Sequence, residues 1–198
     1  MISYQTVTPA TTYPVTTVEA VAHVNAQGVG DDDYLASLNI AATAWAEEYT
    51  GRAFINRTYK AFLDAWPVDT RGYQLTTLDL PKPPLVSVTH VKTYDDADAV
   101  TTFSSASYFV DTNSLKGRLA LRTTAAWPSV TRTANGIEIQ WVAGYGAAAD
   151  VPQPIKQAIL LLVGHWYANR EAVKVGETVA NIPMGVEALL NAYRVWAL

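Results

Sequence analysis

The stretch from Pro152 to Arg170, PQPIKQAILLLVGHWYANR, constrains the fold of this 198-residue chain more than any other. Ile155, Ile159, Leu162 and Trp166 recur at steps of four, three and four, which is the spacing of one helix face. Three further aliphatic residues widen the apolar surface, so the helix should be buried on most sides. The stretch also contains charged residues and is shorter than the roughly 20 apolar residues of a bilayer span. We therefore predict a central core helix.

A second amphipathic helix is predicted over residues 33–50, and Gly51 ends it. Asp31-Asp32-Asp33 precedes it and suits a helix N-terminus, where carboxylates cap free N–H groups and complement the helix dipole. A cation site is the alternative interpretation of the three carboxylates. We expect helices 33–50 and 152–169 to pack together with five residues buried: Leu38, Trp45, Ile159, Leu162 and Trp166.

The N-terminal residues 1–15 are rich in Thr, Pro and Tyr and lack a helical period, which predicts an extended arm. Thr16 and Glu19 then match a capping box, with a hydroxyl at the cap and a carboxylate three residues later. A short helix from about 18 to 26 should follow, with Val18 and Val21 facing inward.

From residue 53 to 148 the hydrophobic period changes to two, with no helical pattern between the strands. We predict one antiparallel sheet system. Asp95 to Asp98 lack the Gly and Glu of a calcium loop and are expected to form a solvated hairpin turn. Asn135-Gly136 favours a type I′ hairpin whose second strand is 137–142.

The C-terminal part should be a loop over 171–183 and a last helix from about Gly185 to Trp196. The predicted fold class is α+β, in which N- and C-terminal helices form the core around an inserted antiparallel β block. The expected division is an extended arm at 1–15, a helical core made of 16–52 and 149–198, and a β insertion at 53–148.

The amino-acid composition argues against several classes of function. The chain has 18 acidic and 14 basic residues, a formal charge of −4, and no run of Lys or Arg, which argues against a protein that grips nucleic acid by its phosphates. It has no cysteine, so disulfides and thiolate metal sites are excluded. We expect a soluble protein made in the cytoplasm, because no signal peptide pattern opens the chain. Six Trp and eleven Tyr hint at an assembly subunit.

Catalytic signatures are absent from the sequence. His23, His90 and His165 lie on three different predicted elements, and no metalloprotease, nucleophile-elbow or phosphate-loop motif occurs. Glu47 and Glu48 are adjacent on a helix and point apart. We predict no catalytic residue, cofactor or metal site, and no enzymatic activity.

Three stretches, in this order, resemble the head–tail connector (adaptor) proteins of tailed bacteriophages and phage-derived gene transfer agents. They are WAEEYTGR at 45–52, LPKPPLVSV at 80–88, and VAGYG at 142–146 leading into the core helix. HWY at 165–167 and IPMGVEALL at 182–190 continue the resemblance, which covers most of residues 31–194.

The resemblance implies a structural virion protein of the head–tail junction. Its subunits would form a ring, commonly of twelve, between the portal protein and the tail or the next connector, a stopper or tail-terminator protein. The ring would extend the channel through which DNA passes without sequence-specific binding, and the acidic balance suits such a conduit. A small-ligand-binding domain or an enzyme whose site is assembled only by the fold stays open as the alternative.

The apolar C-terminus is the candidate portal-binding arm. Its apolar residues must be buried somewhere or remain exposed at a cost of about 25 cal/mol per Å². Self-burial on the helical core and docking on the portal as a helix in a groove both satisfy this requirement. In related connectors a C-terminal arm reaches the portal, which favours docking. The expected contact residues are Leu189, Leu190, Tyr193, Val195, Trp196 and Leu198.

Overall fold

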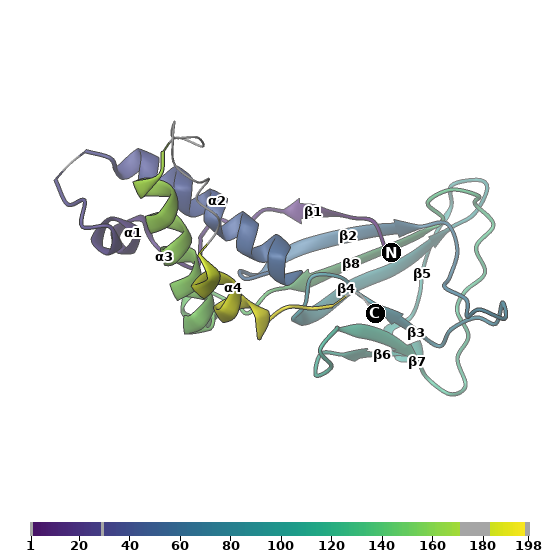
Figure 1. Ribbon diagram of the computed structural model, residues 1–198. Helices are drawn as coiled ribbons and strands as arrows, with labels where there is room; N and C mark the ends of the chain where they lie inside the picture. Colours follow the sequence, from purple (N-terminus) through teal and green to yellow (C-terminus); the bar gives the residue numbers. More distant parts are fainter. Residues whose placement is uncertain (1, 29, 171–182, 197–198) are drawn as a thin grey trace. The chain divides into compact units, whose positions relative to one another are not determined.

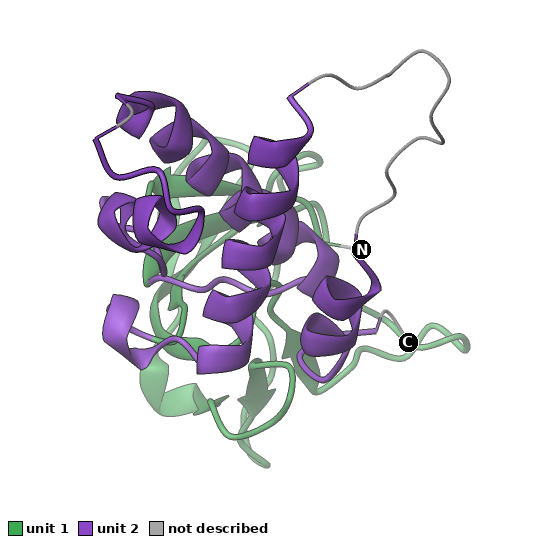
Figure 2. Ribbon diagram, turned by 60° about the vertical axis from the view of Figure 1, so that its left-hand side comes forward, with its two compact units in different colours: residues 1–10, 56–145 green, residues 11–55, 146–198 purple. Residues whose placement is uncertain are grey.

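The computed structural model describes residues 2–28, 30–170 and 183–196 and divides the chain into two compact units (Figures 1 and 2). Unit 1 comprises residues 1–10 and 56–145, and unit 2 comprises residues 11–55 and 146–198. Unit 1 consists mainly of antiparallel strands and unit 2 of helices. The predicted α+β class is confirmed.

The described residues of unit 2 form four α-helices and one short 3-10 helix, η2 (Ala148–Asp150). The α-helices are α1 (Thr17–His23), α2 (Asp32–Thr50), α3 (Gln153–Ala168) and α4 (Met184–Asn191). Helices α2 and α3 coincide with the two predicted core helices to within about a residue at each end, and they pack against each other as expected. Gly51 ends α2 in the left-handed conformation, at φ 69°, which glycine adopts without steric cost.

The core of unit 2 is only partly the predicted one. Ile159 and Leu162 are fully buried, but Leu38, Trp45 and Trp166 are only half-buried, so that part of the prediction was wrong. Helix α2 turns polar residues inward instead. The buried Asn39 amide donates to the Val15 carbonyl oxygen at 2.7 Å, and the Thr43 hydroxyl donates to the Asn39 carbonyl oxygen at 2.8 Å. These donors have partners and can therefore be buried, and hydropathy alone does not identify such residues.

The start of α1 shows the predicted capping box. The Thr16 hydroxyl oxygen accepts a hydrogen bond from the Glu19 backbone N–H at 3.2 Å, and the Glu19 carboxylate accepts one from the Thr16 N–H at 2.7 Å. The inward face was predicted wrongly, because Val18 is 78% exposed and Ala20 is the buried residue of this helix. The small helix presents a single side chain to the core.

Asp31 is the N-cap residue of α2, but its side chain caps no backbone N–H. Its carboxylate accepts from the Tyr167 hydroxyl at 2.7 Å and from the Arg170 guanidinium instead. These two bonds, the one from Tyr167 first, lower the pKa of Asp31. Asp31, the first residue of the acidic triplet, therefore connects the start of α2 to Tyr167 of α3 and to Arg170 just after it. Among the described residues, no acidic or histidine cluster has the arrangement of a metal site.

All strands that the structure describes lie in unit 1, and every pairing between them is antiparallel as predicted. They are β1 (Tyr4–Thr8), β2 (Arg57–Leu63), β3 (Thr77–Asp79), β4 (Leu85–Tyr94), β5 (Val100–Thr102), β6 (Tyr108–Asp111), β7 (Arg118–Leu121) and β8 (Ile137–Ala143), with a 3-10 helix η1 (Ser105–Ser107). They form a five-stranded sheet of order β1-β2-β8-β4-β5 and a three-stranded sheet of order β3-β7-β6, where one sheet system was expected (Figure 1).

The Asn135-Gly136 hairpin prediction was wrong. Strand β8 pairs with β2 and β4, and no strand directly before Asn135 pairs with it in the described part of the chain. The Asn135 N–H donates to the Asp64 carboxylate at 2.7 Å. A Cβ on Gly136 would lie 2.3 Å from Cγ1 of Val130, so glycine is needed here for close packing. The dipeptide therefore serves long-range contacts rather than a two-residue turn.

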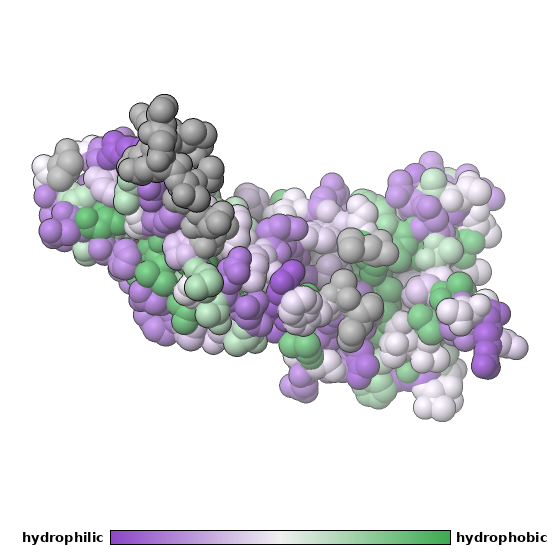
Figure 3. All heavy atoms as spheres, in the orientation of Figure 1, coloured by the Kyte–Doolittle hydropathy of each residue, from purple (hydrophilic) through white to green (hydrophobic). Residues whose placement is uncertain are grey.

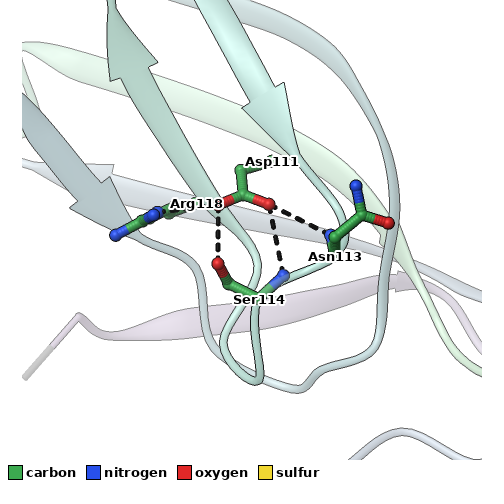
Figure 4. A network of polar contacts seen from close by, with 4 residues as sticks. All are labelled: Asp111, Asn113, Ser114 and Arg118. Atoms are coloured by element: carbon green, nitrogen blue, oxygen red, sulfur yellow. Dashed lines mark hydrogen bonds and ion pairs between the residues drawn. The ribbon is translucent and has the colours of Figure 1, made fainter.

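Aspartate side chains order several turns of unit 1. The predicted hairpin turn after Tyr94 is confirmed, and the Asp95 carboxylate accepts from the N–H groups of Ala97 and Ala99 at 2.9 and 2.8 Å. Asp111 plays the same part between β6 and β7. Figure 4 shows its carboxylate accepting from the Asn113 N–H, the Ser114 N–H, the Ser114 hydroxyl and the Arg118 guanidinium. The Ser114 hydroxyl, then Arg118, hold the pKa of Asp111 at about 2.

Candidate docking site at the C-terminus

Helix α4 is the part of the C-terminal segment that packs one face against the other helices of unit 2. It follows Pro183, a residue suited to a helix start, and it packs on α3 and α2. Val186 and Leu190, four residues apart and hence on one helix face, are both fully buried. Burying these two aliphatic side chains ties α4 to the helical core. Leu190 is therefore a core residue in this conformation.

The residues after α4 leave the helix and bind the end of α2. The Arg52 guanidinium donates to the Tyr193 carbonyl oxygen, and the Val195 N–H donates to the Thr50 carbonyl oxygen at 2.9 Å. The Tyr49 hydroxyl donates to the Asn191 side-chain oxygen at 2.8 Å. The Tyr193 carbonyl and the Val195 N–H therefore bond to residues at the end of α2 and not within a helix. The helix predicted to reach Trp196 accordingly ends at Asn191.

Three aromatic rings and one guanidinium stack on one another where the end of α2 meets the residues after α4. The rings of Trp45 and Tyr49, one turn apart on α2, stack with centroids 5.0 Å apart. The Arg194 guanidinium lies 4.9 Å from the Tyr49 ring centroid and 4.2 Å from the Trp196 ring centroid, distances typical of cation–π contacts. Trp196 is 60% exposed. We name Trp45, Tyr49, Arg194 and Trp196 the aromatic stack.

The predicted arm residues differ in their accessibility. Trp196 is exposed, whereas Leu189, Tyr193 and Val195 are half-buried. Leu190 is fully buried, and Leu198 lies outside the described residues. The sequence prediction missed Trp45, Tyr49 and Arg52 as neighbours of this segment. The spacing of four between Trp45 and Tyr49 places these two on one helix face, but no local pattern indicates what covers that face, and Arg52 lies beyond the end of the helix.

A polar cluster in unit 1 brings four ionisable side chains together around Glu138. The buried Glu138 carboxylate lies 2.7 Å from the His90 ring, 2.8 Å from the Tyr94 hydroxyl and 3.2 Å from the Lys60 ammonium. Burial acts to raise the pKa of Glu138, but the bonds from His90, Tyr94 and Lys60 outweigh it and the pKa is lowered. A carboxylate engaged by three partners is held for structure and is poorly placed to transfer protons.

The histidines, the possibility of a membrane-spanning helix and the surface hydropathy are the remaining features to consider. The three histidines lie on α1, β4 and α3, as predicted, and so belong to three separate elements. In the part of the chain that the structure describes, no helix is both long and apolar enough to cross a membrane. Figure 3 shows hydrophobic residues interspersed with polar ones on the face that it draws.

Comparison with known proteins identifies the family. Residues 15–196 match the family model described as "Head completion protein". No curated protein matches the chain significantly. Among solved structures, a chain of the neck of an empty GTA particle, computed with C6 symmetry, aligns with a TM-score of 0.80 and 25% identity over 99% of this chain and 97% of its own length.

Two further solved structures agree with this match. A chain in the virion of a native gene transfer agent particle has a TM-score of 0.80 and 25% identity, covering 98% of this chain and 96% of its own. A chain of the neck of a native GTA particle, computed with C12 symmetry, has a TM-score of 0.75 and 26% identity, covering 100% and 97%. The family resemblance seen in the sequence is confirmed, and the chain belongs to the head completion protein family.

Proposed function

We propose that this chain is a head–tail connector subunit that forms a ring, of twelve copies, in the neck of a phage or phage-like particle. The observation that carries this proposal is the end-to-end similarity to a neck chain whose structure was computed with C12 symmetry, at a TM-score of 0.75. The match to head completion proteins over residues 15–196 supports the same role. A ring of twelve also suits a chain rich in aromatic residues, which favour interface centres.

In this proposal the ring lies between the portal protein and a stopper or tail-terminator protein and extends the DNA channel. The net charge of −4 favours passage of DNA over its retention, because binding to phosphates needs clustered cations. The helical segments, 16–52 and 149–198, form the connector core, the β insertion is 53–148, and residues 1–15 are an N-terminal arm. The role is structural and needs no catalysis.

The portal-binding part of the proposal concerns the segment after α4. The candidate contacts are the exposed Trp196 and the half-buried Tyr193, Val195 and Leu189. Trp, Tyr and Arg are the residue types enriched at the energetic centres of interfaces, and Trp196, Tyr193 and Arg194 are of these types. Leu190, and Leu198 beyond the described residues, belong to the predicted arm too, but Leu190 contributes only if α4 leaves its place on α3.

The test is binding to portal rings with a truncation that spares the core. Removal of residues 192–198 takes away the segment beyond α4 and keeps Val186 and Leu190, which hold α4 in place. We expect the truncated chain to fold, as seen by circular dichroism, and to lose binding to purified portal rings in cosedimentation.

The full-length chain should cosediment with portal rings as a multiple-copy oligomer that follows the portal's symmetry. One copy per ring at saturation would contradict the ring proposal. Full binding by the truncated chain would remove the C-terminal segment from the portal interface and leave the connector role to other surfaces.

A further inference from the structure

The five-stranded sheet of unit 1 has two open edges. Strand β1 is the last strand on one side of the order β1-β2-β8-β4-β5 (Figure 1). On the other side, β5 pairs only with Lys92–Tyr94, the final part of β4, and the Phe103 N–H donates to the Val91 carbonyl oxygen. No strand among the described residues pairs with the outer side of Val86–Thr89. We call β1 and Val86–Thr89 the two open edges.

Neither open edge carries a charge. Strand β1 reads YQTVT and all five of its residues are exposed. Val86–Thr89 reads VSVT, and three of its four residues are exposed, including Val86 at 45%. Natural edge strands normally carry Lys, Pro or other groups that prevent pairing with another chain. Both edges have register irregularities of this kind, between Thr6 and Thr8 on β1 and, on β4, between Leu85 and Ser87 and between Val88 and His90. They still lack charge and are rich in β-branched residues, which suits them to accept a further strand.

The two edges are complementary in direction. Each neighbouring pair in β1-β2-β8-β4 is antiparallel, so β1 and β8 run one way and β2 and β4 run the other. When β1 of one copy is placed beside β4 of another copy in the same orientation, the two strands are antiparallel, as all other pairs in the sheet are. Each copy would use a different edge toward each neighbour, and such a heterologous contact closes into a ring when the rotation permits.

We propose that the ring is held together by sheet extension, in which β1 of one copy pairs with Val86–Thr89 of the next copy. The occupant of each edge is therefore a second copy of this chain. Pairing satisfies the outward N–H and C=O groups of both edges and buries the exposed side chains of Tyr4, Val7 and Val86. This inference rests on the proposed ring and assigns the surface that builds it.

Cross-linking tests the pairing, because the chain has no cysteine of its own. A Gln5→Cys and Ser87→Cys double variant places one thiol on each open edge, at exposed positions. Within one copy, β1 and β4 are three strand spacings apart, about 14 Å. A bis-maleimide shorter than this, with a flexible spacer that tolerates a shift of register, can join the two edges only between copies.

The double variant bound to purified portal rings should give a ladder of cross-linked dimers, trimers and longer oligomers. Each single variant should give none, because a head-to-tail contact never brings two identical edges together. A double variant that binds portal rings in many copies without a ladder would overturn the sheet extension and leave the proposed function intact. A chain that fails to bind portal rings would refute the proposed function instead. The cross-linking is then run on the concentrated free chain, where a ladder supports the edge pairing and its absence overturns it.

A lysine introduced on the β4 edge gives a second test of the proposed pairing. Val86→Lys should abolish the ladder when introduced into the double variant, because an edge lysine blocks strand addition. The matched control is Val18→Lys, which places the same substitution on an exposed residue of α1. It should leave the ladder unchanged. An unchanged ladder in Val86→Lys would overturn the assignment of this edge.

Discussion

Two substitutions in the C-terminal segment should affect different properties. Leu190→Ala should lower the stability of the fold, and Trp196→Ala should weaken binding to the portal protein. The Leu190 side chain, on the core-facing side of α4, is fully buried, whereas Trp196 is 60% exposed and its ring contacts the Arg194 guanidinium at 4.2 Å. Deleting a fully buried Leu side chain costs about 2–5 kcal/mol of unfolding free energy. An exposed cation–π contact contributes only about 0.5–1 kcal/mol. The two variants should therefore differ clearly in stability.

The assay is thermal unfolding by circular dichroism combined with binding to purified portal rings. Leu190→Ala should lower the melting temperature by about 5 °C or more, while Trp196→Ala should change it little. Trp196→Ala should weaken portal binding by at least about 2 kcal/mol, or roughly 30-fold in Kd, as interface hot spots do. Met184→Ala, at a largely exposed position of the same helix, is the control for both measurements.

Two results would refute this reasoning. A Leu190→Ala variant that melts like the parent would show that α4 is not docked on the core. A folded Trp196→Ala variant that binds portal rings with the parent's affinity would show that Trp196 is not a portal contact.

Three further predictions concern stability. Leu162→Ala should cost about 2–5 kcal/mol in urea unfolding, since the residue is fully buried in α3, and a variant as stable as the parent would contradict its place in the core. Asp111→Asn should lower the melting temperature at neutral pH. Because the folded pKa of Asp111 is depressed to about 2, its stabilisation is complete above the unfolded value and is lost as the pH falls from about 4 to 2, so the gap between variant and parent should narrow over that range. A gap that stays constant down to pH 3 would exclude this role. Glu138→Ala should cost about 1–3 kcal/mol, because His90 and Tyr94 lose their common partner. Equal urea midpoints of variant and parent would show that the polar cluster is not stabilising.

Local patterns were sufficient for several elements. The spacing of apolar residues predicted α2 and α3 nearly to their ends, since a helix face repeats every 3.6 residues whatever the helix packs against. The capping box at Thr16 and the hairpin turn at Asp95 were also predictable, because their hydrogen bonds join residues two to four positions apart. The family could likewise be inferred from the order of short motifs along the chain.

Other features depend on residues that are distant in sequence. Asn135-Gly136 has the composition of a tight turn, but contacts with Asp64 and Val130 give it a different role. The last helix is shorter than its apolar pattern suggests, because Arg52 and Thr50 bond to the backbone of the residues after α4. Asn39 is buried because a carbonyl 24 residues earlier accepts its amide hydrogen bond.

By itself the sequence determined which segments are helical or extended, the α+β class and the family, because periodicity, caps and motif order are properties of neighbouring residues. Only the tertiary structure decided that residues 4–8 form an edge strand and that Tyr49, stacked on Trp45, lies beside Arg194. Both outcomes result from hydrogen bonds and ring contacts between segments separated by 50 to about 150 residues, a separation over which no local pattern carries information.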